Sequence, residues 1–254
     1  MFHWYDYILV GLAALAAGAV NALAGGGTLI TFPVLTAIGI PAVAANITNT
    51  VALCPGYFGA TFAQMKDLRG QKERLWLYLP IGIIGGVVGG YLLLISGERI
   101  FRSLVPILIL MASLLLAVSD ALRAWLVRRS GKSAEAANLL IWGIFPLGLA
   151  AVYGGYFGAG MSVILLAVLG LVVNDSITRL NALKQALALS INISAAVFFV
   201  FSGSVVWHVV IWMAGCALLG GLLGGKLASR IKPTLLRWIV VGIGVAVAMI
   251  YLLR

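Results

Sequence analysis

Charged residues are confined to short stretches of this 254-residue chain, and long tracts between them carry none. No Asp, Glu, Lys or Arg occurs between Asp6 and Lys66. The other charge-free tracts cover residues 75–97, 103–119, 136–174, 185–225 and 238–253. A helix needs about 20 mostly apolar residues to cross a bilayer, so the tracts predict roughly eight to ten crossings in one transmembrane domain, residues 1–254.

The overall composition excludes a water-soluble domain and a nucleic-acid partner. Only 9% of the residues are charged, where a soluble domain carries about 25%. The net charge of +10 comes from basic residues in short loops beside apolar tracts, which is a pattern of membrane topology. The expected partner is therefore the lipid bilayer. Cys54 and Cys216 lie inside apolar tracts and are interpreted as small core residues without a disulfide.

The chain contains an internal repeat. Residues 84–91, with paired glycines, reappear as residues 219–226, which is an offset of 135. Repeats of this kind are common in secondary transporters. We predict a first repeat at residues 1–125, a cytoplasmic linker at 126–135 and a second repeat at 136–254. The predicted apolar segments lie at about 7–23, 28–40, 45–64, 75–95 and 102–121, and at about 138–153, 159–173, 178–201, 206–226 and 236–253.

The loop charges predict how the two halves are oriented. Four basic residues occur at 66–74, after the third segment of the first half, but the matching loop at 202–206 carries none. Two further basic stretches occur at 123–132 and 226–237. Placing all three basic stretches in the cytoplasm satisfies the positive-inside rule and leaves both termini periplasmic. The sequence thus predicts an all-α integral membrane protein, an inverted repeat of two five-segment halves with 8–10 spans.

The second segment of each half is short and follows a run of glycines. Short, glycine-interrupted segments at matching places in two halves are typical of the midplane binding site of a transporter. The alternative is that these glycines serve only tight helix packing. The candidate site residues from these stretches are Gly25, Gly26, Gly27 and Thr28 in the first half, and Gly158 and Gly160 in the second.

The third segment of each half carries polar residues at matching positions. Asn46, Asn49 and Thr50 align with Asn181, Lys184 and Gln185, and all six are candidate binding residues. If the second of these helices begins near Ser176, Lys184 lies roughly 12 Å along it, close to mid-bilayer. A lysine at that depth indicates function. The alternative is that its ammonium group snorkels to the cytoplasmic interface.

Together these residues favour a small anionic substrate. Helix N-termini exposed by glycine breaks bind oxyanions, and Lys184 adds a positive charge. The seven acidic residues all fall at segment ends or in loops, so no buried carboxylate relay is expected. No metal-ligand cluster, nucleophile–base pair or cofactor-binding motif occurs, so we expect neither an enzyme nor a bound cofactor.

The chain resembles the sulfite exporter TauE/SafE family, also called the toluene sulfonate uptake permease family. The resemblance rests on residues 21–33, 39–46, 154–160 and 179–185 and extends through the repeat. It implies a transporter of the bacterial inner membrane that moves sulfite, sulfonates or related sulfur-containing anions, often outward. The second half departs from the glycine–proline pattern of the first, because Leu166 stands at the position that matches Pro33.

Other functions stay open from the sequence. The alternatives to secondary transport are a passive anion channel, in which the breaks would form a selectivity filter, and a membrane subunit that does not transport. The direction, the coupling ion and the oligomeric state, a homodimer included, also stay open.

Overall fold

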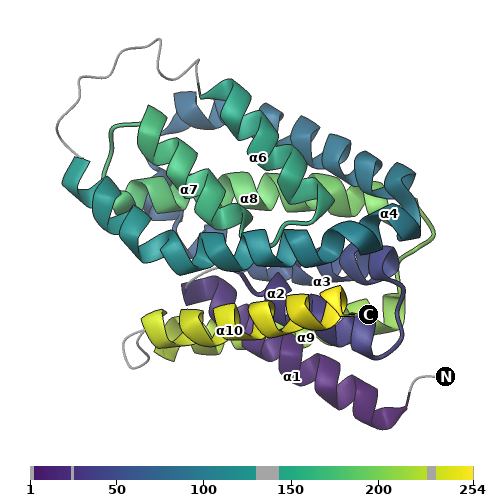
Figure 1. Ribbon diagram of the computed structural model, residues 1–254. Helices are drawn as coiled ribbons and strands as arrows, with labels where there is room; N and C mark the ends of the chain where they lie inside the picture. Colours follow the sequence, from purple (N-terminus) through teal and green to yellow (C-terminus); the bar gives the residue numbers. More distant parts are fainter. Residues whose placement is uncertain (1–2, 24–25, 130–142, 228–232, 254) are drawn as a thin grey trace.

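The structure, a computed structural model, describes residues 3–23, 26–129, 143–227 and 233–253. These residues form helices and connections, with no strand among them, which confirms the all-α prediction (Figure 1). In chain order the elements are α1 (Trp4–Leu23), α2 (Thr28–Ala37), α3 (Ala42–Ala63), the short 3₁₀ helix η1 (Met65–Leu68), α4 (Lys72–Arg129), α6 (Ile144–Tyr156), α7 (Met161–Val172), α8 (Ile177–Val200), α9 (Trp207–Leu227) and α10 (Pro233–Leu252).

Each predicted segment coincides with a helix or with part of one. Helix α4 contains the fourth and fifth segments of the first half, and its backbone leaves the helical conformation at Gly97 (φ 65°, ψ 177°). We call residues 72–96 the first arm of α4 and residues 98–129 its second arm. The positive φ of Gly97 is a conformation that residues with a Cβ rarely adopt. A single glycine therefore separates the two arms.

Helix α4 extends into the residues predicted as a linker, 126–135. Helix α4 continues to Arg129, so the first four residues of the predicted linker are helical. Leu126 is buried and fits against Gly170 of α7, and this contact stabilises the additional helical turn. The rest of the predicted linker lies outside the described residues.

The helix lengths and their surfaces suit a bilayer. Helices α1, α4 and α8 are long and apolar enough to cross one. Helices α2 and α7 contain 10 and 12 residues, which extend only about 15 and 18 Å against a hydrocarbon core of about 30 Å. Large apolar side chains face outward, with Trp76 81% and Ile211 72% exposed. Such side chains fit an environment of lipid tails.

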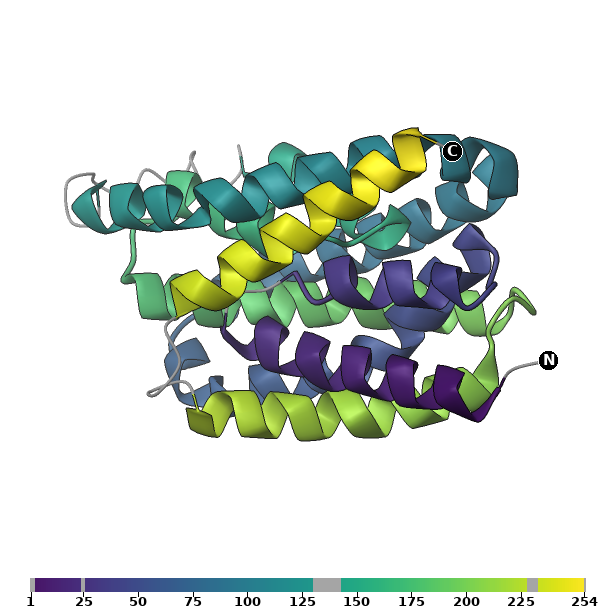
Figure 2. The same ribbon diagram turned by 60° about the horizontal axis from the view of Figure 1, so that its bottom comes forward.

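The two halves pack reciprocally. The first segment of each half lies along the fourth segment of the other, as α1 against α9 (Figure 2) and α6 against the first arm of α4 (Figure 1). Glycines allow the backbones to approach closely. A Cβ at Gly18 of α1 would collide with the carbonyl oxygen of Ala217 in α9, and a Cβ at Gly89 of α4 with that of Val152 in α6.

The third segments, α3 and α8, run antiparallel through the interior. Near one end of this pair, the Thr61 hydroxyl of α3 donates to the carbonyl oxygen of Gln185 in α8 at 3.2 Å. Further along, the Cys54 thiol of α3 lies 3.6 Å from the carbonyl oxygen of Asn192. Because residue numbers fall along α3 as they rise along α8, equivalent positions of the two repeats lie at opposite ends of the pair.

Candidate functional site

The connection between α1 and α2, residues 24–27, is the first break. Gly25 lies outside the described residues. Gly26 has φ +94°, and a Cβ on it would lie 3.1 Å from Cδ2 of Leu116 in the second arm of α4. A Cβ on Gly27 would lie 2.6 Å from the carbonyl oxygen of Ala17, and the Gly27 N–H donates to Oδ1 of Asn21 at 2.8 Å. Glycine is therefore required here both for conformation and for space.

The second break, residues 157–160, connects α6 to α7. Gly158 and Gly160 have φ values of +77° and +74°. The N–H groups of Ala159, Gly160 and Ser162 donate to no other group in the part of the chain that the structure describes. These donors lie at the N-terminus of α7, where the helix dipole adds partial positive charge. The second break thus presents backbone donors suited to an anion.

Both breaks contact the same face of one helix. Gly26 lies against Leu116 of the second arm of α4, and a Cβ on Gly160 would lie 3.2 Å from Cα of Ala112 in the same arm. Residues four apart share a helix face and are separated by about 6 Å along the axis. The structure therefore brings the breaks of the two halves to neighbouring positions on α4.

Three buried aromatic side chains pack the two breaks together. The ring centroid of Phe32 in α2 lies 5.4 Å from that of Phe157 in the second break and 6.2 Å from that of Phe101 in α4. The Phe101 and Phe157 centroids are 6.0 Å apart. All three side chains are fully or almost fully buried. The interrupted backbone is thus covered by protein, which is the condition for non-helical backbone at membrane depth.

Polar side chains of α3 connect both breaks. The Thr31 hydroxyl of α2 donates to Oδ1 of Asn49 at 2.5 Å, and Nδ2 of Asn49 donates to the Thr28 hydroxyl at 3.3 Å. One turn earlier, Nδ2 of Asn46 donates to the carbonyl oxygen of Tyr156, the last residue of α6, at 2.8 Å. Helix α3 therefore contacts the start of α2 from one half and the end of α6 from the other. The Thr50 hydroxyl donates within α3, to the carbonyl oxygen of Asn46 at 2.9 Å.

The polar residues of α8 form a separate cluster. The Lys184 ammonium group donates to Oδ1 of Asn181 at 2.8 Å, and Nδ2 of Asn181 donates to Oε1 of Gln64, just after α3, also at 2.8 Å. The neighbouring Gln185 side chain is buried. Gln64 follows Asn46 by 18 residues, which corresponds to about 27 Å of helix.

The predicted residues that the structure describes thus do not gather at one place. Gly26, Gly27, Thr28, Asn46, Asn49, Gly158 and Gly160 lie at the breaks, with Thr50 next to them on α3, whereas Asn181, Lys184 and Gln185 lie near the opposite end of α3. The physical reason is the antiparallel packing of α3 against α8. Asn46 and Asn181 are each one turn inside their helix, so the antiparallel arrangement carries them to opposite ends.

Helix α8 begins as expected, with Ser176 as its N-cap and the Ser176 hydroxyl accepting from the Arg179 N–H at 3.4 Å. Lys184 therefore lies roughly 12 Å along a helix of 24 residues, which is about 36 Å long. Its ammonium group is a third of the way along α8 and at the level of the last turn of α3.

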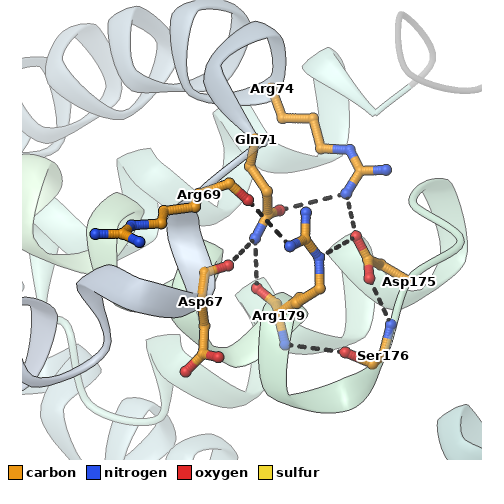
Figure 3. Close-up of polar contacts among 7 residues, drawn as sticks. All are labelled: Asp67, Arg69, Gln71, Arg74, Asp175, Ser176 and Arg179. Carbon is orange, nitrogen blue, oxygen red and sulfur yellow. Dashed lines mark hydrogen bonds and ion pairs between the residues drawn. The ribbon is translucent and has the colours of Figure 1, made fainter.

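An ion-pair network fixes this end of α8 (Figure 3). The Asp175 carboxylate pairs with Arg74 at 2.5 Å and with Arg179 at 2.9 Å. Partial burial alone would raise the pKa of Asp175, but hydrogen bonds from Arg179, Arg74 and the Ser176 N–H outweigh it and lower the pKa below its usual value. The Gln71 side chain also donates to the carbonyl oxygen of Arg179 at 3.2 Å. The network ties the connection between α3 and α4 to the start of α8.

Several residues of the site carry no signal in the sequence. Phe32, Phe101, Phe157, Ala112 and Leu116 occupy apolar tracts in which lipid-facing and buried residues are of the same types. Thr31 could have been found from its spacing, because it lies one turn after Thr28 and so shares a helix face with it.

Known proteins resemble the chain over most of its length. A probable membrane transporter protein of Haemophilus influenzae is 25% identical over 222 residues, which is 87% of this chain and 85% of the relative. A probable membrane transporter protein of a Sinorhizobium species is 25% identical over 252 residues, 97% of this chain and 92% of the relative. With its apolar helices and interrupted segments, this chain is a multi-pass membrane transporter.

The family follows from a second comparison. The profile described as "Sulfite exporter TauE/SafE" matches residues 10–251, which is nearly the whole chain. The chain belongs to this family.

The first break provides a test of whether the glycines act in transport. Gly26→Leu should abolish transport in a folded, inserted protein, because its side chain would press on Leu116 where the two breaks meet. The matched control is Gly39→Leu in the connection between α2 and α3, where φ is also positive, +91°, but a Cβ would have nothing within 4 Å. Uptake into proteoliposomes and the elution profile of both purified variants are the measurements. Normal transport by Gly26→Leu would mean that this glycine serves packing alone.

Proposed function

We propose that this membrane transporter is a secondary transporter of a small sulfur-containing anion, sulfite or a sulfonate, and that it exports the anion from the cytoplasm. The observation that carries the proposal is the meeting of the two breaks on one face of α4, with unpaired N–H groups at the start of α7. Such donors bind oxyanions without needing a buried cation. The family description, which names sulfite export, supports the substrate class and the direction.

A flux assay tests this function. Purified protein in proteoliposomes should take up radiolabelled sulfite with saturation, and external unlabelled sulfite should drive exchange of labelled sulfite from the lumen. A carrier exchanges in this way because it binds its solute on each side in turn. Conductance without saturation or exchange would instead indicate a channel, and the absence of any flux of sulfite or sulfonates would indicate a subunit that does not transport.

We also propose that the two halves are inverted in the bacterial inner membrane, with both termini in the periplasm. The antiparallel pairing of α3 with α8 supports this arrangement. If the two halves were instead related by a rotation axis along the membrane normal, their equivalent helices would be parallel. The reciprocal packing of α1 on α9 and of α6 on α4 is what a twofold relation between the halves requires.

Cysteine accessibility tests this orientation. In a variant with Cys54 and Cys216 replaced by Ala, Phe201→Cys in the connection between α8 and α9 should react with an impermeant thiol reagent added to the periplasmic side. Phe201 is 83% exposed, so access is not limited by packing. The control, Met65→Cys in the basic connection between α3 and α4, should react only from the cytoplasm. Labelling of both positions from the same side would contradict the inverted arrangement.

We propose that Lys184, Asn181 and Gln185 receive the anion before it reaches the breaks. These residues lie beside the basic connection between α3 and α4, which the charge pattern assigns to the cytoplasmic face. A positive charge at the mouth of a pathway raises the local concentration of anions. This role does not require Lys184 to touch the anion at the breaks.

Salt dependence distinguishes an entry charge from a binding residue. Lys184→Ala should raise KM about three- to ten-fold at low ionic strength, and the effect should shrink in concentrated salt, where charges are screened. The control Lys66→Ala removes an exposed charge of the same connection and should change KM less. An unchanged KM for Lys184→Ala at low salt would remove Lys184 from the pathway.

A further inference from the structure

We propose that the transported anion carries its own hydrogen-bond donor, an O–H or N–H group, and presents it to the side-chain carbonyl oxygen of Asn46. The inference rests on the proposed function and narrows its substrate class. Hydrogensulfite and hydroxyalkyl sulfonates belong to this narrower class. Sulfite without a proton and simple alkyl sulfonates do not.

The orientation of the Asn46 amide is fixed by its neighbour. Nδ2 donates to the carbonyl oxygen of Tyr156 at 2.8 Å, and a carbonyl oxygen can only accept. Rotating the amide by half a turn would place two acceptors against each other. Oδ1 of Asn46 is therefore an acceptor that points away from Tyr156.

That acceptor is buried and has no partner among the described residues. Asn46 is only 1% exposed. Buried polar atoms in proteins are nearly always hydrogen-bonded, so an unpaired one calls for a group that the chain alone does not supply. An acceptor calls for a donor, and an oxyanion without a hydrogen cannot provide one.

Asn49 shows that a buried side-chain amide on α3 can find hydrogen-bond partners for both its oxygen and its nitrogen. It lies one turn after Asn46, and both ends of its amide are used, with Oδ1 accepting from Thr31 and Nδ2 donating to Thr28. The two asparagines are equally buried. The unpaired oxygen is thus particular to Asn46 and is not a general property of α3.

The unpaired oxygen adjoins the second break. Tyr156, which holds the Asn46 amide, precedes Gly158 by two residues. Because consecutive Cα atoms are 3.8 Å apart, Ala159 lies at most about 11 Å from Tyr156. The N–H groups of Ala159 and Gly160, which donate to no group among the described residues, thus follow within four residues of the carbonyl group that holds the Asn46 amide. The two N–H groups can donate to the negatively charged oxygens of an anion, and Oδ1 of Asn46 can accept a hydrogen bond from the O–H or N–H group of the same anion.

Such a solute would also bring its own proton across the membrane when its donor is an acidic O–H. The acidic residues of the described spans lie at the start of a helix or arm, except for Asp120, which lies nine residues before the end of α4. Asp6 is in the first turn of α1, Glu98 accepts from the N–H groups of Ala42 and Val43 at the start of α3, and Asp120 pairs with Arg237. The Asn46 amide does not take up a proton. It recognises the donor group of the solute only by accepting a hydrogen bond from it.

Two anions of equal charge and closely similar size test the inference. 2-Hydroxyethanesulfonate has a hydroxyl group where 1-propanesulfonate has a methyl group. Calorimetry on the purified full-length protein, in sodium-free buffer, should show about tenfold tighter binding of the hydroxyl compound, which is the value of one hydrogen bond of about 1.4 kcal/mol. Asn46→Leu, which keeps the size of the side chain, should bring the two affinities to within about twofold of each other.

A matched variant controls for disturbance of α3. Asn49→Leu lowers the affinity for both anions if the packing at the first break suffers, but it should preserve their ratio. If Asn46→Leu does not fold, Asn46→Ser removes the reach of the amide oxygen with less disturbance and should also abolish the preference.

The outcomes separate the inference from the function on which it rests. Equal affinities of the unmodified protein for the two anions would overturn the inference and mean that a water molecule satisfies Asn46, while leaving anion transport intact. If the preference for 2-hydroxyethanesulfonate persists in Asn46→Leu and Asn46→Ser, the acceptor lies elsewhere. If anion binding requires sodium, and both variants lose this requirement, Oδ1 of Asn46 binds a sodium ion instead. Failure to bind either sulfonate or sulfite would overturn the proposed function together with the inference.

Discussion

The hydrocarbon core of a bilayer offers no water to backbone N–H and C=O groups, so a helix is interrupted there only where protein covers the interruption. The two breaks in this chain meet that condition together. Phe32, Phe101 and Phe157 pack over them, and Ala112 and Leu116 of α4 close them from one side. The N–H groups of Ala159 and Gly160, which donate to no group in the described part of the chain, are thereby covered by protein.

The antiparallel pairing of α3 with α8 determines what each repeat contributes. Helix α3 lies beside both breaks, through Asn49 at the start of α2 and Asn46 at the end of α6. The matching residues of α8, Asn181 and Lys184, lie near the opposite end of the pair and contact Gln64. The matching residues of α3 and α8 therefore lie in two different places, at the breaks and in a separate cluster around Lys184.

The helical segments could be predicted from the sequence because charged residues are so costly in a bilayer that their absence marks each span. The glycine breaks were also predictable, because Gly27 and Gly160 directly precede the first residues of α2 and α7. The separation of Lys184 from Asn46 does not follow from their matching positions alone, but the inverted orientation predicted from the loop charges implies it, because it makes α3 and α8 antiparallel. The aromatic side chains over the breaks were not predictable, because a buried Phe and a lipid-facing Phe look alike in an apolar tract.

The central claim is that the two breaks form one binding site, and the number of anions bound per chain tests it most directly. Calorimetric titration of the purified protein with sulfite should give one site per chain. The same titration of Gly26→Leu and of Gly158→Leu, one in each break, should show that either change alone removes binding, because both breaks contribute to the same site. Two sites per chain, of which each variant retains one, would contradict the account and mean that the halves bind anions independently.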